Sequence, residues 1–430
     1  MKRLTLLFLT LTLCLALGLV SFVTLNARAS NGVNRSSGAL PGVTSGYAYG
    51  GLLLSPAGSS VASVGPLFPV GLGCSITNKT VSASGASMQL GTFASSGSVT
   101  DTVTSTHTAT TADIHANSTV QSVNILVGLI TSGRVTADAF SHATATNASS
   151  TGSATFVNLV VAGRSISRTP APNTIIRLPG LGYVVLNEQS GPVNGVNHTS
   201  FSVHAIDVNI TQANTLGLPV GTRIIIAHAN SSFDRTNVLA VVSATAYGLL
   251  GVTKVGSSFV NSGPWAPASI GCTGGSSTVS NPGVTLAGVG STGTITDKAF
   301  GQITSSGPQA NSSSHVQSVN LLNATITGDV FTTAQAAFIK GSGSASATTT
   351  LTNAKVLGNP LPANPAPNTK ITIPGVGYVI VNEQKITITS TGASASVNGF
   401  DLVVTMANSF GLPSGTRIIV AHSNASVTIA

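Results

Sequence analysis

Few residues of this 430-residue chain could perform acid–base chemistry, and those few recur in both of its halves. Glu188 and Glu383 are the only glutamates, each within an Asn-Glu-Gln triplet. A glycosidase needs two carboxylates that face one bond, and each half offers one Glu with one Asp, Asp207 or Asp401. A half-buried Glu188 would have a raised pKa, whereas a carboxylate paired with Arg223 or capping a turn would be structural. We favour the structural interpretation, because structural ion pairs also perturb titration.

His228 and His422 end the final predicted strand of each half, which Arg223 and Arg417 begin. A nucleophile beside such a histidine would suggest acyl transfer, but the chain contains no G-x-S-x-G motif. Arg223 and His228 are five positions apart, and a straight strand sends residues at odd spacing to opposite faces. The sequence therefore predicts no shared site for them and no catalytic residues.

Metal-binding patterns are also missing. The chain contains no H-x-x-x-H, H-E-x-x-H, paired-cysteine or EF-hand spacing. Asp101, Asp113 and Asp297 are isolated acids that could ligate calcium only with the help of loop carbonyls. We expect no metal and no cofactor.

The overall composition predicts a β-protein. Only 7% of residues are charged and 42% are hydrophobic, which excludes the low-hydropathy, high-charge signature of disorder. Ser, Thr, Asn and Gly must solvate the surface, and a chain rich in β-branched Thr and Val and in Gly favours strands and turns over helices. No run of Lys or Arg occurs, so the net charge of +8 does not indicate a nucleic-acid partner.

The start of the chain is typical of an export signal. A basic beginning precedes an apolar run over residues 4–23, and Ala27 and Ala29 supply the small residues that signal peptidase accepts. We expect a signal peptide over residues 1–29 with cleavage before Ser30. The alternative is an uncleaved anchor, because the apolar run approaches the length of a bilayer span. The first interpretation predicts an extracellular or cell-surface protein whose mature chain has no stable transmembrane segment.

The mature chain contains two copies of one long sequence repeat. Residues 171–189 recur as 366–384 with 13 of 19 positions identical, and residues 217–232 recur as 411–426 with 12 of 16 identical. A repeat this long indicates two whole domains. After a flexible segment over residues 30–42, we predict β-domains over residues 43–235 and 236–430. Turn signals about every ten residues favour two all-β, sandwich-like domains, with a β-solenoid as the alternative.

Strands can be assigned by alternation within each copy. Ile206, Val208 and Ile210 should point to the core and Asp207 away from it. By the same rule, Glu188 should share the face of Val184 and Leu186 and lie opposite Tyr183 and Asn187. Cys74 and Cys272 occupy equivalent places in the two copies, either as small buried side chains or in a bridge between copies or molecules.

Three blocks of copy one, Pro172–Gln189, His204–Val208 and Gly221–His228, resemble the bacterial choice-of-anchor P proteins. Residues 123–131 and 135–139 are similar to the middle segment of that family. The resemblance implies an exported cell-surface β-domain with varied C-terminal anchors and no known enzymatic activity. No apolar tail or basic cluster precedes Ala430, so we expect release or non-covalent retention.

These observations predict a non-enzymatic structural or adhesive β-protein of the cell surface or medium. The alternative is a polysaccharide-binding module, which exposed Trp265, Tyr183 and Tyr378 would indicate, and a secreted hydrolase ranks third. Candidate partners are cell-wall polymer, polysaccharide, or further copies pairing through uncharged edge strands.

Overall fold

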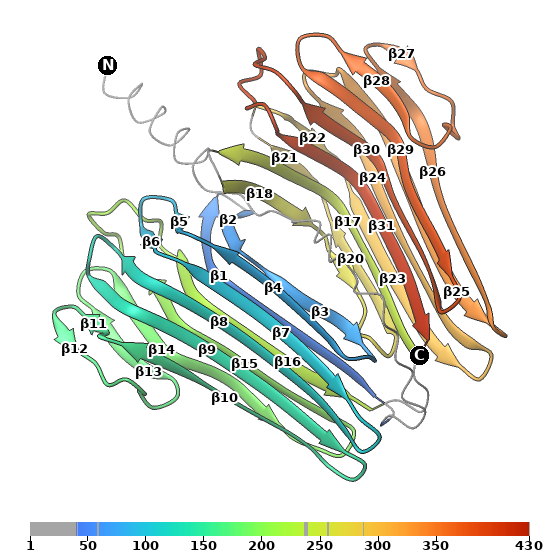
Figure 1. The fold of residues 1–430 in the computed structure, drawn as a ribbon. Coiled ribbons are helices and arrows are strands. Elements are labelled where there is room, and N and C mark those ends of the chain that lie inside the picture. The colour runs from blue at the N-terminus through green and yellow to red at the C-terminus, as the bar shows by residue number, and fades with distance from the viewer. Residues whose placement is uncertain are drawn as a thin grey trace, which may run out of the picture. The chain divides into compact units, whose positions relative to one another are not determined.

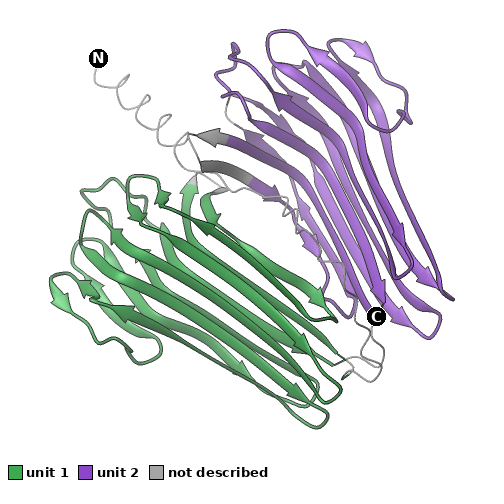
Figure 2. Ribbon diagram, viewed as in Figure 1, with its two compact units in different colours: residues 1–237, 258–261 green, residues 238–257, 262–430 purple. Residues whose placement is uncertain are grey.

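The computed structural model describes residues 40, 42–57, 60–235, 240–255, 258–286 and 288–429. The predicted signal peptide, including Ala27, Ala29 and Ser30, lies outside these residues, as does most of the segment 30–42. The chain divides into two compact units, residues 1–237 with 258–261 and residues 238–257 with 262–430 (Figure 2). Within the described ranges, no helix has the length and apolarity that crossing a membrane requires.

Unit 1 contains two antiparallel sheets. The first has the spatial order β13 (Thr174–Leu178), β14 (Gly182–Val193), β15 (His198–Ile210), β16 (Arg223–Asp234), β1 (Val43–Ala57) and β2 (Ser60–Leu67), with β3 (Val70–Ser75) also paired to β1. The second has the order β4 (Lys79–Gly85), β7 (Val99–His107), β8 (Thr111–Ile125), β9 (Ile130–Thr144) and β10 (Ala148–Val157), extended by β5 (Met88–Leu90), β6 (Ala94–Ser96), β11 (Val160–Val161) and β12 (Arg164–Ser165).

Unit 2 repeats this plan. Its first sheet has the order β28 (Thr369–Ile373), β29 (Gly377–Thr389), β30 (Gly392–Val404), β31 (Arg417–Ile429) and β17 (Ala240–Val255), followed by the part of β18 (Ser258–Trp265) that belongs to this unit, with β19 (Ala268–Ser269) also paired to β17. Its second sheet has the order β20 (Gly275–Asn281), β23 (Ile295–Thr304), β24 (Gly307–Leu321), β25 (Ile326–Ile339), β26 (Ser342–Val356) and β27 (Asn359–Pro360), with β22 (Gly290–Thr292) paired to β24 and β21 (Val284–Leu286) paired to β22.

The two sheets of each unit pack face to face, which confirms the all-β, sandwich-like prediction over the solenoid (Figure 1). Alternating Val, Ile, Ala and Leu residues fill the space between the sheets. Ser141 and Ser231 share a hydrogen bond of 2.9 Å across the core of unit 1. Gly50 lets the sheets approach closely, because a Cβ atom there would lie 2.4 Å from Val99. Cys74 and Cys272 are partly exposed and disulfide-bonded, so of the two interpretations of these cysteines a bridge is the one observed and buried small side chains are not.

One backbone irregularity crosses the first sheet of each unit and changes which side chains face the core. Ala227 and Asn187 have φ angles of 56° and 51°, and the regular cross-strand pairing skips both positions. Ile226 and Ala227 consequently both belong to the core. The inward positions therefore change from even to odd numbers at Ala227. Ala421 and Asn382, with φ angles of 54° and 55°, do the same in unit 2.

The prediction that Arg223 and His228 lie on opposite faces was wrong for this reason. The side chains of Ile224, Ile226, Ala227 and Ala229 point into the core, so both Arg223 and His228 point away from it. The placement of Glu188 was also wrong.

Asn187 is the cause of the second error. Its Oδ1 accepts a hydrogen bond of 2.8 Å from the Ala154 N–H of the second sheet, so the Asn187 side chain points inward. Glu188 therefore lies on the face opposite Val184 and Leu186, where Tyr183 also lies. A straight strand would have placed Asn187 and Glu188 the other way round.

Candidate functional site

The shared irregularity gathers polar side chains in one cross-strand row on the face of the first sheet that points away from the core. In unit 1, Tyr49 pairs with His228, His228 with His204, and His204 with Glu188. Asp207 and Arg223 lie beside this row. We call the following residues the unit 1 polar cluster: Tyr49, Glu188, His204, Asp207, Arg223 and His228.

Arg223 holds the unit 1 polar cluster together. Its Nε donates to Asp207 Oδ2 at 2.7 Å, its Nη2 also bonds that oxygen, and the same Nη2 donates to Glu188 Oε2 at 3.1 Å. His204 Nδ1 lies 2.7 Å from Glu188 Oε2. The arrangement found is thus the structural alternative, a carboxylate paired with Arg223. Both acids of the cluster are already occupied by cationic or hydrogen-bonding partners.

The two carboxyl groups have pKa values shifted in opposite directions. Burial raises the pKa of Asp207 to about 6, with Arg223 opposing the shift. The hydrogen bond from His204 lowers the pKa of Glu188 to about 2, although partial burial opposes it. Glu188 is therefore ionised at neutral pH and lacks the raised pKa that a general acid needs.

Unit 2 builds the same arrangement with one substitution. We call the following residues the unit 2 polar cluster: Tyr247, Glu383, Asn398, Asp401, Arg417 and His422. Arg417 Nε donates to Asp401 Oδ1 at 2.7 Å, and its Nη2 donates to Glu383 Oε2 at 3.0 Å. Asn398 stands where unit 1 has His204, and its Nδ2 donates to Glu383 Oε2 at 2.6 Å. An amide thus performs the same hydrogen bonding as the imidazole.

The unit 1 polar cluster contains the three residue types of a metal site, but they do not fit a metal. One potential ligand atom each from Glu188, His204 and Asp207 lies within 4.8 Å of the others. Arg223 Nη2 bonds both carboxylates and lies 3.4 Å from His204 Nδ1. A cation is already present at the point where these atoms converge, and it would repel a second one.

Two histidines of the polar clusters, His228 and His422, are largely buried. Each ring stacks on a tyrosine, His228 on Tyr49 and His422 on Tyr247, with ring centroids 4.5 Å apart in both pairs. Burial lowers the pKa of His228 to about 3 and that of His422 to about 4. Both imidazoles are therefore neutral in the folded protein.

Replacing His228 by phenylalanine should reduce the loss of stability in acid. An unfolded histidine gains its proton near pH 6.5, whereas folded His228 resists protonation until about pH 3. Stability is therefore present above pH 6.5 and is lost as the pH falls below it. His228→Phe keeps the stacking and cannot be protonated, so it should spare on the order of 2–3 kcal/mol at pH 4.

Urea-unfolding midpoints between pH 4 and 7 measure this effect. His198→Phe, a change at an exposed histidine, controls for histidine removal as such. Parallel midpoint curves for wild type and His228→Phe would show that His228 does not resist protonation.

Two carboxyl groups to which the sequence analysis assigned no role are buried in the structure. Asp101 and Asp297 are both 0% exposed, and within the described residues their carboxyl oxygens have no hydrogen bond of good geometry. Burial raises the pKa of Asp101 to about 8 and that of Asp297 to about 7, partly opposed by a nearby serine hydroxyl and glycine N–H. The sequence carried one signal for this pair. Asp101 and Asp297 lie 196 positions apart, and so do Ser118 and Ser314, so both residue types recur together in the two copies.

None of the three aspartates considered for calcium has the surroundings of a calcium site. Asp101 and Asp297 face the core, and Asp113 Oδ1 lies 2.5 Å from His142 Nδ1 on the neighbouring strand. Among the described residues, no group of three ligating side chains includes any of them.

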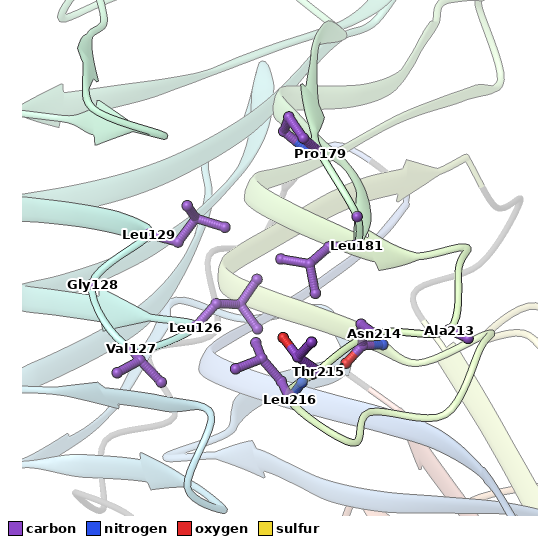
Figure 3. A pocket seen from close by; sticks show the side chains of 11 residues that line it. Leu126, Val127, Gly128, Leu129, Pro179, Leu181, Ala213, Asn214, Thr215 and Leu216 are labelled. Atoms are coloured by element: carbon purple, nitrogen blue, oxygen red, sulfur yellow. Dashed lines mark hydrogen bonds between the residues drawn. The ribbon is translucent and has the colours of Figure 1, made fainter.

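The end of unit 1 carries an apolar groove of about 870 Å³ (Figure 3). Leu126, Leu129, Leu181 and Leu216 point into it from three loops. The groove also contains the side-chain amide of Asn214, which is hydrogen-bonded within its own loop. Asn214 Nδ2 donates to Leu218 O, and Oδ1 accepts from the Leu216 and Leu218 N–H groups. Thr215 supplies the only hydroxyl among the lining residues, and no acid or base among them could activate it.

The aromatic residues proposed as sugar platforms are in structural positions. Trp265 is half-buried against the core of unit 2. Tyr183 and Tyr378 are also half-buried, and Lys370 Nζ lies 3.8 Å from the centroid of the Tyr378 ring. These three side chains therefore do not form an exposed sugar-binding surface.

Comparison with known proteins adds no relative. No protein-family model matches this chain, and a search of curated protein sequences likewise gives no match.

Proposed function

We propose that this chain is a non-enzymatic structural or adhesive β-protein that is exported to the cell surface or the medium. One observation carries the proposal: the residues best suited to chemistry form closed ion-paired clusters that recur in both units. The replacement of His204 by Asn398 supports it further, because an amide cannot act as an acid or base at neutral pH. The clusters fix the sheet and leave the remaining surface for contact.

The resemblance to the choice-of-anchor P proteins supports the same proposal, since it implies an exported surface β-domain. The export signal predicted over residues 1–29 supports the location. A cell-wall polymer, a polysaccharide or another copy of the chain would be the partner.

Fractionation of cells that produce the full chain tests this proposal. The protein should be recovered at the cell surface or in the medium, and its mature N-terminus should be Ser30. Recovery of the uncleaved chain in the cytosol would contradict the proposal.

A secreted hydrolase is the competing function that the same residues could serve. Glu188→Gln combined with Glu383→Gln should lower thermal stability, because each change removes an ion pair with an arginine. A hydrolytic activity that is present in the wild type and lost in this double variant, at temperatures where both are folded, would favour the enzyme instead.

A further inference from the structure

The second sheet of unit 2 presents aromatic rings to solvent on its face away from the core. Phe300 and Phe331 are 38% and 39% exposed, on β23 and β25. In the cross-strand rows, Phe300 lies beside Asn311, which pairs with Gln335. Phe331 pairs with His315, whose ring is perpendicular to it at a centroid distance of 5.7 Å.

Unit 1 has a related face built from β8 and β9, on which the aromatic ring of Phe140 is half-buried. The ring of Phe140 lies between those of His115 and His142, at centroid distances of 6.1 and 6.4 Å. His115 Nε2 lies 2.6 Å from Asp138 Oδ2, and His142 Nδ1 lies 2.5 Å from Asp113 Oδ1. The carboxylates on this face are thus paired with imidazoles.

Hydroxyl groups surround these rings. The neighbouring outward positions are Thr102, Thr104, Thr119, Thr136 and Thr151 in unit 1 and Thr296, Ser313, Thr333, Thr348 and Thr350 in unit 2. We call the two surfaces, formed by these hydroxyl residues and the aromatic, histidine and amide residues named above, the aromatic faces.

The histidine–phenylalanine pairs are not required by the fold. Thr119 and Thr136 pair in unit 1 at the position that His315 and Phe331 occupy in unit 2, as the alignment of Val120 with Val316 shows. Conversely, Asn311 and Gln335 occupy in unit 2 the position of His115 and Phe140 in unit 1. Each unit folds the same way without the other's pair, whereas the polar clusters occupy equivalent positions. The fold therefore does not need these pairs, and we assign them a role at the protein surface.

We propose that the aromatic faces bind an extended, uncharged polysaccharide chain. The inference rests on the proposed function and names the partner of the adhesive surface. Sugar rings would stack on the exposed rings of Phe300 and Phe331, because the flat apolar face of an aromatic ring suits them, and the half-buried Phe140 would take a lesser part. The adjacent amide, hydroxyl and imidazole groups would exchange hydrogen bonds with the sugar hydroxyls.

Charge and shape on these faces favour this partner. Asp113 and Asp138 each lie within hydrogen-bond distance of an imidazole, and Lys298 is the single Asp, Glu, Lys or Arg in the row of Phe300, the row of Phe331 and the row between them. With two acids on one face and one lysine on the other, the aromatic faces have no cluster of cations that could select an anionic polymer. The rings are separated by polar side chains and form no contiguous apolar patch of the size that marks a protein interface. Neighbouring strands about 4.8 Å apart give a broad flat surface that suits a polymer better than a small molecule.

Depletion assays with the purified full chain test the proposal. The probes are insoluble cellulose, chitin and mannan as uncharged polymers, and pectate as an anionic one. The variant Phe140→Ala/Phe300→Ala/Phe331→Ala removes the rings. Ile388→Ala is the matched control, because Ile388 is 53% exposed and lies on β29, in the other sheet of unit 2. Thermal unfolding confirms that both variants remain folded.

The wild type should bind at least one of the three uncharged polymers and keep binding in high salt. The triple variant should bind it about tenfold more weakly, and Ile388→Ala should bind as the wild type does. No binding to any of the three, equal binding by the triple variant, or salt-sensitive binding to pectate alone would each overturn the inference. So would self-association that the triple variant abolishes without any polymer binding.

Failure here is distinguishable from failure of the proposed function. A surface-located protein that binds none of the polymers overturns this inference alone. A cytosolic protein contradicts the proposed function whatever it binds.

Discussion

Asp101→Asn is expected to make the protein more stable above neutral pH and to leave it nearly unchanged near pH 4. Asp101 is completely buried in unit 1, and burial raises its pKa to about 8. Asparagine has nearly the same shape and does not ionise. The variant therefore removes the cost of keeping a carboxyl group in the core.

The direction follows from the two states of the carboxyl group. Below about pH 4 it is protonated in both the folded and the unfolded chain, so it costs nothing. As the pH rises from about 4 to 8, the unfolded chain ionises while folded Asp101 keeps its proton, and stability is lost. At about 1.4 kcal/mol per pKa unit, the gain of the variant should reach several kcal/mol near pH 8.

Unfolding free energies measured from pH 4 to 9 test this expectation. Asp297→Asn should show a smaller gain in unit 2, because the pKa of Asp297 is raised only to about 7. Asp234→Asn, at a partly exposed carboxyl group, is the control for removing a charge. A wild type and an Asp101→Asn variant with the same pH dependence would mean that Asp101 is not buried in this way.

Arg223→Met should destabilise unit 1 by about 3–5 kcal/mol at neutral pH, the usual cost of removing one partner of a buried ion pair. The Asp207 side chain is only 1% exposed, and Arg223 is the cation that bonds it. Arg417→Met should do the same in unit 2 through Asp401, which is equally buried. Arg223→Lys should lose less, because it keeps the charge and loses only the fork of hydrogen bonds.

Lowering the pH should partly restore the stability that Arg223→Met loses. Burial already raises the pKa of Asp207 to about 6, and Arg223 opposes that rise. Without Arg223 the folded pKa rises further, so the added cost appears above about pH 6, where wild-type Asp207 ionises and the variant's does not, and it grows as the pH increases. Adding Asp207→Asn to Arg223→Met should restore much of the stability at neutral pH. Denaturant midpoints at pH 4 and 7 measure both effects, and a cost that is independent of pH would contradict them.

The duplication and the strands were readable from the sequence. Residues 171–189 and 366–384 match in composition and in structure, because both copies form the turn and strand at β13–β14 and β28–β29. The alternation of Ile206, Val208 and Ile210 with Asp207 was also correct, but the pattern placed Asp207 on a solvated face and the structure buries it completely. Such local patterns are predictable because side-chain direction in a regular strand depends only on position along it.

The grouping of the site residues was not readable in the same way. Arg223 and His228 share a face only because Ala227 adopts a positive φ angle, and non-glycine residues seldom do so. Asn187 gives a weak signal, since Asn tolerates that conformation better than most residues. Alanine gives none, so a straight strand was the reasonable prediction and it placed Glu188 on the wrong face.

The sequence alone determined that the chain is a pair of related β-domains with little charge and no recognisable catalytic motif. Hydropathy alternation and internal identity are local properties, and they survive without knowledge of the fold. Only the tertiary structure decided that Arg223 closes a cluster with Glu188 and Asp207, that Asp101 is buried, and that Phe300 and Phe331 share a face. The reason is physical: register and backbone irregularities between strands far apart in sequence set which side chains meet.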